Sequence, residues 1–184
     1  NQVVLLQIPE SAKPFLNPLR SAVLKAGANP IVQFIPNGIR DYYELANESQ
    51  LKFFPDKYFK GLVNQIDHRI YIIADSNPQE LRGINPKKLM MKQKAMKPYS
   101  DWLVEKENRG KYTWNIAMYA TPEMAKEAGL SLKEYWNQII KACYLDSPNP
   151  VQKWKGIKKE IERIKEKLNK LNIERVRIQA KGTD

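Results

Sequence analysis

The sequence is nearly without the side chains that most often hold transition metals or act as activated nucleophiles. Its 184 residues include one cysteine, Cys143, and one histidine, His68. Transition-metal sites usually draw several His or Cys ligands together, so one residue of each type argues against such a site. Ser-His-Asp or Cys-His catalysis would have to use His68, and no GxSxG turn accompanies it. We predict no catalytic, cofactor-binding or metal-binding residue in this chain.

Both residues also have simple structural interpretations. Cys143 cannot form an internal disulfide, and it shares an apolar helix face with Ile139 and Ile140. We therefore predict a buried structural thiol. His68 stands just before the apolar run 70–74, where a polar residue at the start of a strand is common.

Clustered glycines and long apolar runs are lacking too. The eight glycines are scattered, with no GxGxxG or GxxxxGK[ST] motif, so the backbone cradle that phosphate binding needs is not encoded. Apolar runs such as 3–6 and 70–74 fall far short of the roughly 20 residues of a membrane-spanning helix. No basic segment followed by a long apolar one opens the sequence. We expect no membrane span and a cytoplasmic location.

Charge, in contrast, is abundant and mostly positive. Lys and Arg number 31 against 20 Asp and Glu, giving a net charge of +11, with the excess in residues 85–111 and 151–184. Basic patches can bind nucleic acid, but here cations alternate with acidic residues, as on solvated helix faces with short-range ion pairs. Two alternatives stay open. The faces meet an acidic surface on another domain or subunit, or the chain is a stand-alone basic binding module for nucleic acid or an acidic protein.

Strand and helix patterns alternate along the chain. Residues 3–8 form a near-continuous apolar run ended by Pro9, typical of a strand buried on both faces of a parallel sheet. A helix is expected over about 11–26, with Ser11 as candidate cap and Gly27 at its end. Further strands are predicted at 31–35, 69–75, 112–119 and 175–180. Because strand-helix-strand order requires a crossover, we predict an α/β, three-layer domain with a mostly parallel sheet of about five strands, Rossmann-like or flavodoxin-like without a nucleotide motif.

The other helices follow from apolar residues spaced three and four apart. Within 38–65 we expect two short helices divided near Pro55, with their aromatic residues in the core, not in a base-stacking platform, because the region is nearly neutral. A long helix is predicted at 85–108, which Pro98 should kink or divide. Thr121 and Ser131 each begin a helix. The second of these has a stripe predicted to be buried, comprising Leu132, Tyr135, Trp136, Ile139, Ile140 and Cys143.

One long amphipathic helix is expected after the short link 146–150, which we do not interpret as a domain boundary. Its apolar residues recur every three or four positions from Val151 to Leu171. The spacing approximates heptads, so coiled-coil pairing is compatible with it. Packing on the sheet is the simpler use, and the length leaves room for a dimer contact.

The polar turn 75–78 follows the third predicted strand. Ligands of open parallel sheets bind beyond the carboxyl ends of strands, so Asp75, Ser76 and Asn77 stand where a site would lie. Asp, Ser, Asn and Pro also close turns through local hydrogen bonds. We favour the interpretation as a turn.

Positions that match the sequence pattern of a known protein family extend through nearly the whole chain. Their densest part comprises Trp114, 119–122, 124–125, 128–131 and 142–146, and their outer parts comprise Ala74, Asp75, Asn77, Pro78, 83–87, Pro150, Val151, Trp154 and 182–184. In these positions the chain resembles the thermophilic metallo-aminopeptidase family, the group of aminopeptidase T and aminopeptidase S. It departs from the family pattern at Ala120 and Asn149, both in predicted turns.

The resemblance implies a two-domain enzyme that releases N-terminal amino acids from peptides and forms a homodimer. Its catalytic cluster of Glu, His, Tyr and Asp around two divalent metal ions, zinc or cobalt, would follow the junction at 182–184. Residues 1–184 would then be a single N-terminal α/β domain, inactive alone, that serves as scaffold, dimer contact and access limit. A composition rich in Lys, Glu and Ile agrees with a thermophilic origin.

Overall fold

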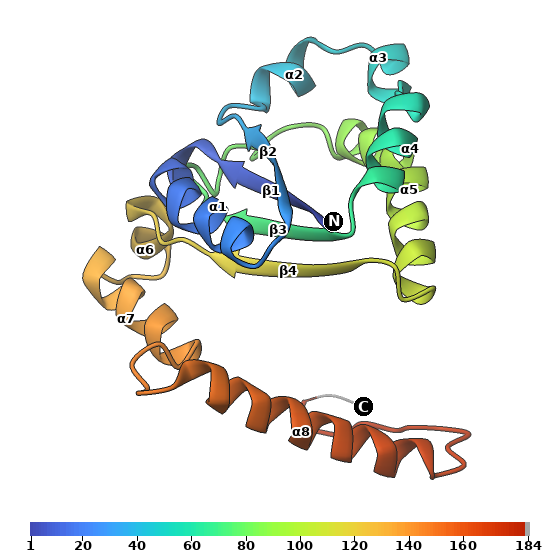
Figure 1. Cartoon of the computed structure of the whole chain (residues 1–184). Coiled ribbons are helices and arrows are strands. Elements are labelled where there is room, and N and C mark those ends of the chain that lie inside the picture. The colour runs from blue at the N-terminus through green and yellow to red at the C-terminus, as the bar shows by residue number, and fades with distance from the viewer. Residues whose placement is uncertain (183–184) are drawn as a thin grey trace. The chain divides into compact units, whose positions relative to one another are not determined.

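The computed structural model describes residues 1–182, which form two compact units, 1–136 and 137–182. The first unit is built on a four-stranded sheet with the order β2-β1-β3-β4 and all neighbouring strands parallel (Figure 1). The strands are β1 (Val3–Pro9), β2 (Asn29–Ile35), β3 (His68–Ile73) and β4 (Thr113–Met118). The predicted α/β class and parallel sheet are confirmed.

Helices connect the strands and continue beyond them. They are a 3-10 turn η1 (Glu10–Phe15), α1 (Leu16–Lys25), α2 (Arg40–Leu45), α3 (Glu48–Lys52), α4 (Asp56–Gln65), α5 (Pro86–Asn108), α6 (Pro122–Glu127), α7 (Leu132–Ala142) and α8 (Pro150–Asn169). Within the described part of the chain, none of these helices is both long and apolar enough to span a bilayer.

Strand β1 is the centre of the sheet because its residues are apolar on both faces. Val4, Leu6 and Ile8 are buried toward α1, whereas Val3 and Leu5 are buried toward α4 and α5. Each such side chain contributes about 1.5–3 kcal/mol when fully buried. The two clusters make three layers, with α1 on one side of the sheet and α4 and α5 on the other (Figure 1).

The expected fifth strand is absent, so the prediction of about five strands was wrong by one. Over 175–180 the described backbone is irregular and only Ala180 forms an isolated bridge. Alternating apolar residues specify a strand only where a neighbouring strand takes up the backbone hydrogen bonds. The predicted junction at 182–184 lies partly outside the described residues.

The helix predicted at 11–26 begins later than expected, and Ser11 does not cap it. Pro14 has no backbone N–H, and the chain passes it as a 3-10 turn before α1 starts at Leu16. The Ser11 hydroxyl instead donates to the carbonyl of Ala74 at the end of β3. At the other end Gly27, with φ of 78°, stops the helix as predicted.

Two further helix predictions need correction. Residues 38–65 form three helices, not two, because Ala46 is extended and Asn47 starts α3 with a capping box to Gln50. Of the two outcomes expected at Pro98, division of the helix is ruled out, because α5 is continuous over its length; a kink stays a prediction. Tyr99 and Leu103, which follow Pro98, pack in the apolar cluster around Val3 and Leu5 of β1. This packing offsets the helix hydrogen bond that Pro98 cannot donate.

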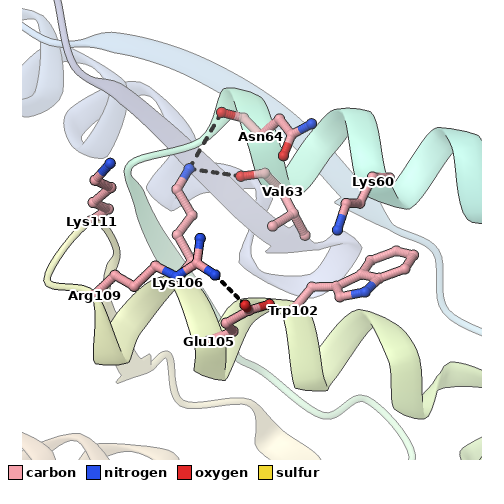
Figure 2. Close-up of a pocket in the computed structure, with 8 residues that line it drawn as sticks. All are labelled: Lys60, Val63, Asn64, Trp102, Glu105, Lys106, Arg109 and Lys111. Carbon is pink, nitrogen blue, oxygen red and sulfur yellow. Dashed lines mark hydrogen bonds and ion pairs between the residues drawn. The ribbon is translucent and has the colours of Figure 1, made fainter.

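Three lysines of α5 hold the carboxyl ends of the preceding helices. The Lys88 ammonium donates to the carbonyls of Tyr43, Glu44 and Ala46 at the end of α2, at 2.6, 3.1 and 3.2 Å. Lys92 donates to the carbonyl of Phe53 after α3, at 3.3 Å. Lys106 donates to the carbonyls of Val63 and Asn64 at the end of α4 (Figure 2) and to that of Ile66, the next residue after the helix. A cation at a helix carboxyl end meets unpaired carbonyls and the negative pole of the helix dipole.

Three polar side-chain atoms are buried where α5 packs on the sheet. The hydroxyls of Tyr99 and Tyr112 and the Nε of Arg69 are buried without a hydrogen-bond partner in the described structure. Burial raises the pKa of Tyr112 to about 12, against the opposing effect of the Arg69 charge. Burial also raises the pKa of Tyr99. Neutral phenols are therefore part of the folded core.

We predict that Tyr112→Phe is neutral or stabilising at pH 7, because it removes a buried hydroxyl that lacks a partner. The wild-type phenol titrates near 10 when unfolded and near 12 when folded. Because the unfolded state ionises first, the wild-type protein loses stability through this group as the pH rises from 10 to 12, and it loses none below pH 10. Urea unfolding followed by tryptophan fluorescence should show about 1–2 kcal/mol less alkaline loss in the variant. An identical alkaline loss in both proteins would contradict this assignment.

We also predict that Lys106→Met destabilises the chain by about 1–2 kcal/mol, because the carbonyls at the end of α4 lose their charged donor while the apolar stem is kept. The matched control is Lys111→Met, since the Lys111 ammonium has no hydrogen bond or ion pair within residues 1–182. Thermal and urea unfolding of both variants measure the effect. Equal stability of the two variants would show that the capping contact contributes nothing.

Candidate functional site

The carboxyl edge of the sheet is where a parallel α/β domain would carry a site, and here its backbone is tied down by side chains. The Ser11 hydroxyl donates to the carbonyl of Ala74, and the Thr121 hydroxyl donates to that of Asp75. Thr121 is buried and also caps α6 by accepting from the N–H of Met124, at 3.2 Å. The side chains of Asp75 and Asn77 point to solvent, and within residues 1–182 they make no hydrogen bond. These contacts are those of a fixed turn.

The single histidine lies at the start of β3 and is half-buried. Its Nδ1 is 2.7 Å from the Thr113 hydroxyl on the neighbouring strand β4. Among residues 1–182 no three His, Cys, Asp or Glu side chains lie close enough together to hold a metal ion. His68 thus serves a cross-strand contact.

The single cysteine belongs to the second unit, and its thiol is partly exposed, so the prediction of a buried thiol was wrong. None of the α7 residues is fully buried, so the predicted stripe is only half covered. The backbone carbonyl of Cys143 accepts a hydrogen bond from the indole of Trp154, at 3.1 Å. A thiol nucleophile would need a base, and within residues 1–182 the Cys143 thiol makes no hydrogen bond to one.

A basic cavity of about 210 Å³ lies between α4 and α5 (Figure 2). It is lined by Lys60, Val63, Asn64, Trp102, Glu105, Lys106, Arg109 and Lys111. Lys106 serves the carbonyls at the end of α4, Arg109 pairs with Glu105, and the Lys60 ammonium lies 4.4 Å from the centre of the Trp102 ring. Lys60, Lys106 and Arg109, three of the four cations that line the cavity, therefore already contact other groups of the fold. The cavity is part of the packing between α4 and α5.

Sequence reasoning missed these lysine contacts. The spacing of cations along α5 indicated a solvated face, and ion pairs such as Lys97–Asp101 at 2.6 Å fit that expectation. The carbonyl partners of Lys88, Lys92 and Lys106 lie 39 to 45 residues away in sequence. Only the packing of α5 on the three short helices brings them together, so no local pattern could have shown them.

An apolar surface remains on β4. Trp114, Ile116 and Met118 alternate along the strand on the face shared with Arg69 and Tyr71, and 51, 47 and 43% of their surfaces are exposed. The Trp114 indole donates to Glu107 at 3.1 Å. Patches of this kind mark interaction surfaces more often than catalytic sites. Within residues 1–182 no set of metal ligands is brought together.

Comparison with known proteins identifies the relatives of this arrangement. The chain is 26% identical over 152 residues to aminopeptidase AmpS of Bacillus subtilis (strain 168), covering 77% of this chain and 37% of that protein. It is 27% identical over 119 residues to aminopeptidase PepS of Streptococcus thermophilus, covering 61% and 29%. The chain thus spans well under half the length of these relatives.

The fold also matches a solved structure, wild-type AmpT from Thermus thermophilus, with a TM-score of 0.66 at 24% sequence identity. The match covers 85% of this chain and 40% of that one. The sequence pattern of the family described as thermophilic metalloprotease (M29) matches residues 1–184. Because that match runs the whole length of the sequence, the chain belongs to the M29 family of thermophilic metalloproteases.

Proposed function

We propose that residues 1–184 are the N-terminal, non-catalytic domain of a cytoplasmic, metal-dependent aminopeptidase that releases N-terminal amino acids from peptides. One combination carries the proposal. The family match covers the whole chain, while His, Cys, Asp and Glu within residues 1–182 form no group of three that could hold a metal ion. The relatives named aminopeptidases extend well beyond the matched region.

The family description implies a divalent metal, and we propose two ions, zinc or cobalt. The residues present do not fit them. His68 is engaged with Thr113, Cys143 lies in the second unit, and neither has a second imidazole or thiol to join it. Two ions held close together need several ligands in one place. In this proposal the ligands and the hydrolytic chemistry belong to polypeptide beyond residue 184.

The role we propose for this domain is that of scaffold, dimer contact and access limit for peptide substrates. Its sheet is covered on one face by α1 and on the other by α4 and α5. This layered packing supports the proposal of a scaffold that limits access of peptides. The exposed apolar side chains of β4 support a contact surface, because such side chains gain free energy when another surface covers them.

Three polypeptides test the proposal: the 184-residue chain, the complete reading frame that contains it, and that reading frame without residues 1–184. Each is assayed on aminoacyl-nitroanilides with added zinc or cobalt, and its mass is measured by light scattering. B. subtilis AmpS is the positive control. We expect the complete protein to be an active dimer and the 184-residue chain to be inert, because it lacks the ligands.

Activity of the 184-residue chain comparable to that of the complete protein would refute the assignment of catalysis. The dimer and access roles have a separate criterion. If the protein without residues 1–184 stays dimeric and accepts the same substrates at the same rate, those roles fail while the family assignment stands.

A further inference from the structure

Helix α8 presents an apolar stripe that the described residues of the second unit leave largely exposed. In heptad notation its first-position residues are Trp154, Ile161 and Leu168, and its fourth-position residues are Ile157 and Ile164, with Leu171 just after the end of the helix. Exposed fractions are 57% for Ile161, 46% for Ile164 and 50% for Leu168. This is the register in which side chains of one helix pack into the gaps of another.

The first residue of the stripe is already used inside the unit. The ring of Trp154 lies edge-on to Tyr144, with centroids 5.7 Å apart, and its indole N–H donates to the carbonyl of Cys143. These contacts fix the start of α8 against the preceding turn. The open part of the stripe within the helix therefore runs from Ile157, which is partly buried, to Leu168, a length of about 17 Å.

The positions that flank the stripe are mostly lysine. Lys153, Lys158, Lys165 and Lys167 occupy flanking heptad positions, and Glu160 is the acidic exception. Glu160 is paired with Arg163 of its own helix, and Lys165 is 3.0 Å from Glu162. Over the whole of α8, seven Lys and Arg stand against three Glu. The rim of the stripe is strongly positive.

Charge decides between the occupants that an apolar helix stripe could accept. In a parallel pair of two α8 helices, Lys153 would face Lys158 of the second copy, which cancels the attraction between Glu160 and Lys165. In an antiparallel pair, Lys158 would face Lys165 of the second copy. A helix with acidic flanks meets four lysines and one like charge, Glu160, which is already paired with Arg163. Charges at these positions set partner choice.

We propose that the apolar stripe of α8 is a docking face for an acidic amphipathic helix, one whose own apolar stripe is flanked by Glu or Asp. The inference does not depend on the proposed function, since it uses only the sequence register, exposure and charge of α8. Burial of the stripe supplies affinity, and the lysine rim supplies selectivity.

Two labelled synthetic peptides test the proposal with the 184-residue chain. Both carry Leu and Ile at the stripe positions, and they differ only in having Glu or Lys at the flanking positions. Fluorescence anisotropy at low salt should show the acidic peptide binding at least about tenfold more tightly than the basic one. The difference should shrink at about 1 M salt, where charges are screened beyond roughly 3 Å.

Two variants locate the effect on α8. Ile164→Asp should abolish binding of the acidic peptide, because it places a charge within the stripe. The double variant Lys158→Glu/Lys165→Glu keeps the stripe and should reverse the preference toward the basic peptide. The double variant Lys155→Glu/Lys159→Glu, on the opposite helix face, is the matched charge control and should leave the preference in place. Circular dichroism checks that each variant keeps its helix content.

The proposal is overturned if both peptides bind equally, if neither binds, or if the charge reversal leaves the preference unchanged. It is also overturned if light scattering finds a dimer of the 184-residue chain that Ile164→Asp dissociates, because α8 would then pair with itself.

Discussion

Lysine ammonium groups on the long helix α5 bind the carboxyl ends of three shorter helices. The helical layer of α4 and α5 on one face of the sheet depends on this contact. Helices α2, α3 and α4 have six, five and ten residues, lengths at which an isolated helix is marginal in water. Each ends against Lys88, Lys92 or Lys106 of the 23-residue α5. The ammonium groups satisfy carbonyls that the helices leave unpaired, and α5 and α4 can then cover Val3 and Leu5 of β1.

The same contact changes the meaning of the net charge. Residues 85–111 contain eight Lys and Arg, and five of them are engaged: three with carbonyls, and Lys97 and Arg109 with carboxylates. Much of this charge therefore takes part in contacts within the fold. The charge of α8 differs because it borders an exposed apolar stripe. Two segments of similar composition therefore serve different ends.

Residue patterns within single helices and strands predicted most of the fold. They could not predict contacts between elements that are distant in sequence. The continuous apolar run of β1 and the Pro86 and Gly27 helix signals gave correct elements, because each acts through neighbours in sequence. The 175–180 segment failed because alternation requires a partner strand that no local pattern supplies. For the site, the absence of catalytic and metal-binding residues stays a prediction, whereas the partial exposure of Cys143 was not predictable from its apolar helix face.

Our proposal that the hydrolytic chemistry lies elsewhere in the polypeptide rests on three observations: membership of the M29 family, the lack of a metal-ligand set in the described residues, and the greater length of the relatives. The most direct measurement is the metal content of the 184-residue chain after equilibrium dialysis against zinc or cobalt, with B. subtilis AmpS dialysed in parallel. We predict that the chain retains far less than one ion per molecule. Retention of two tightly held ions by this chain alone would contradict the interpretation.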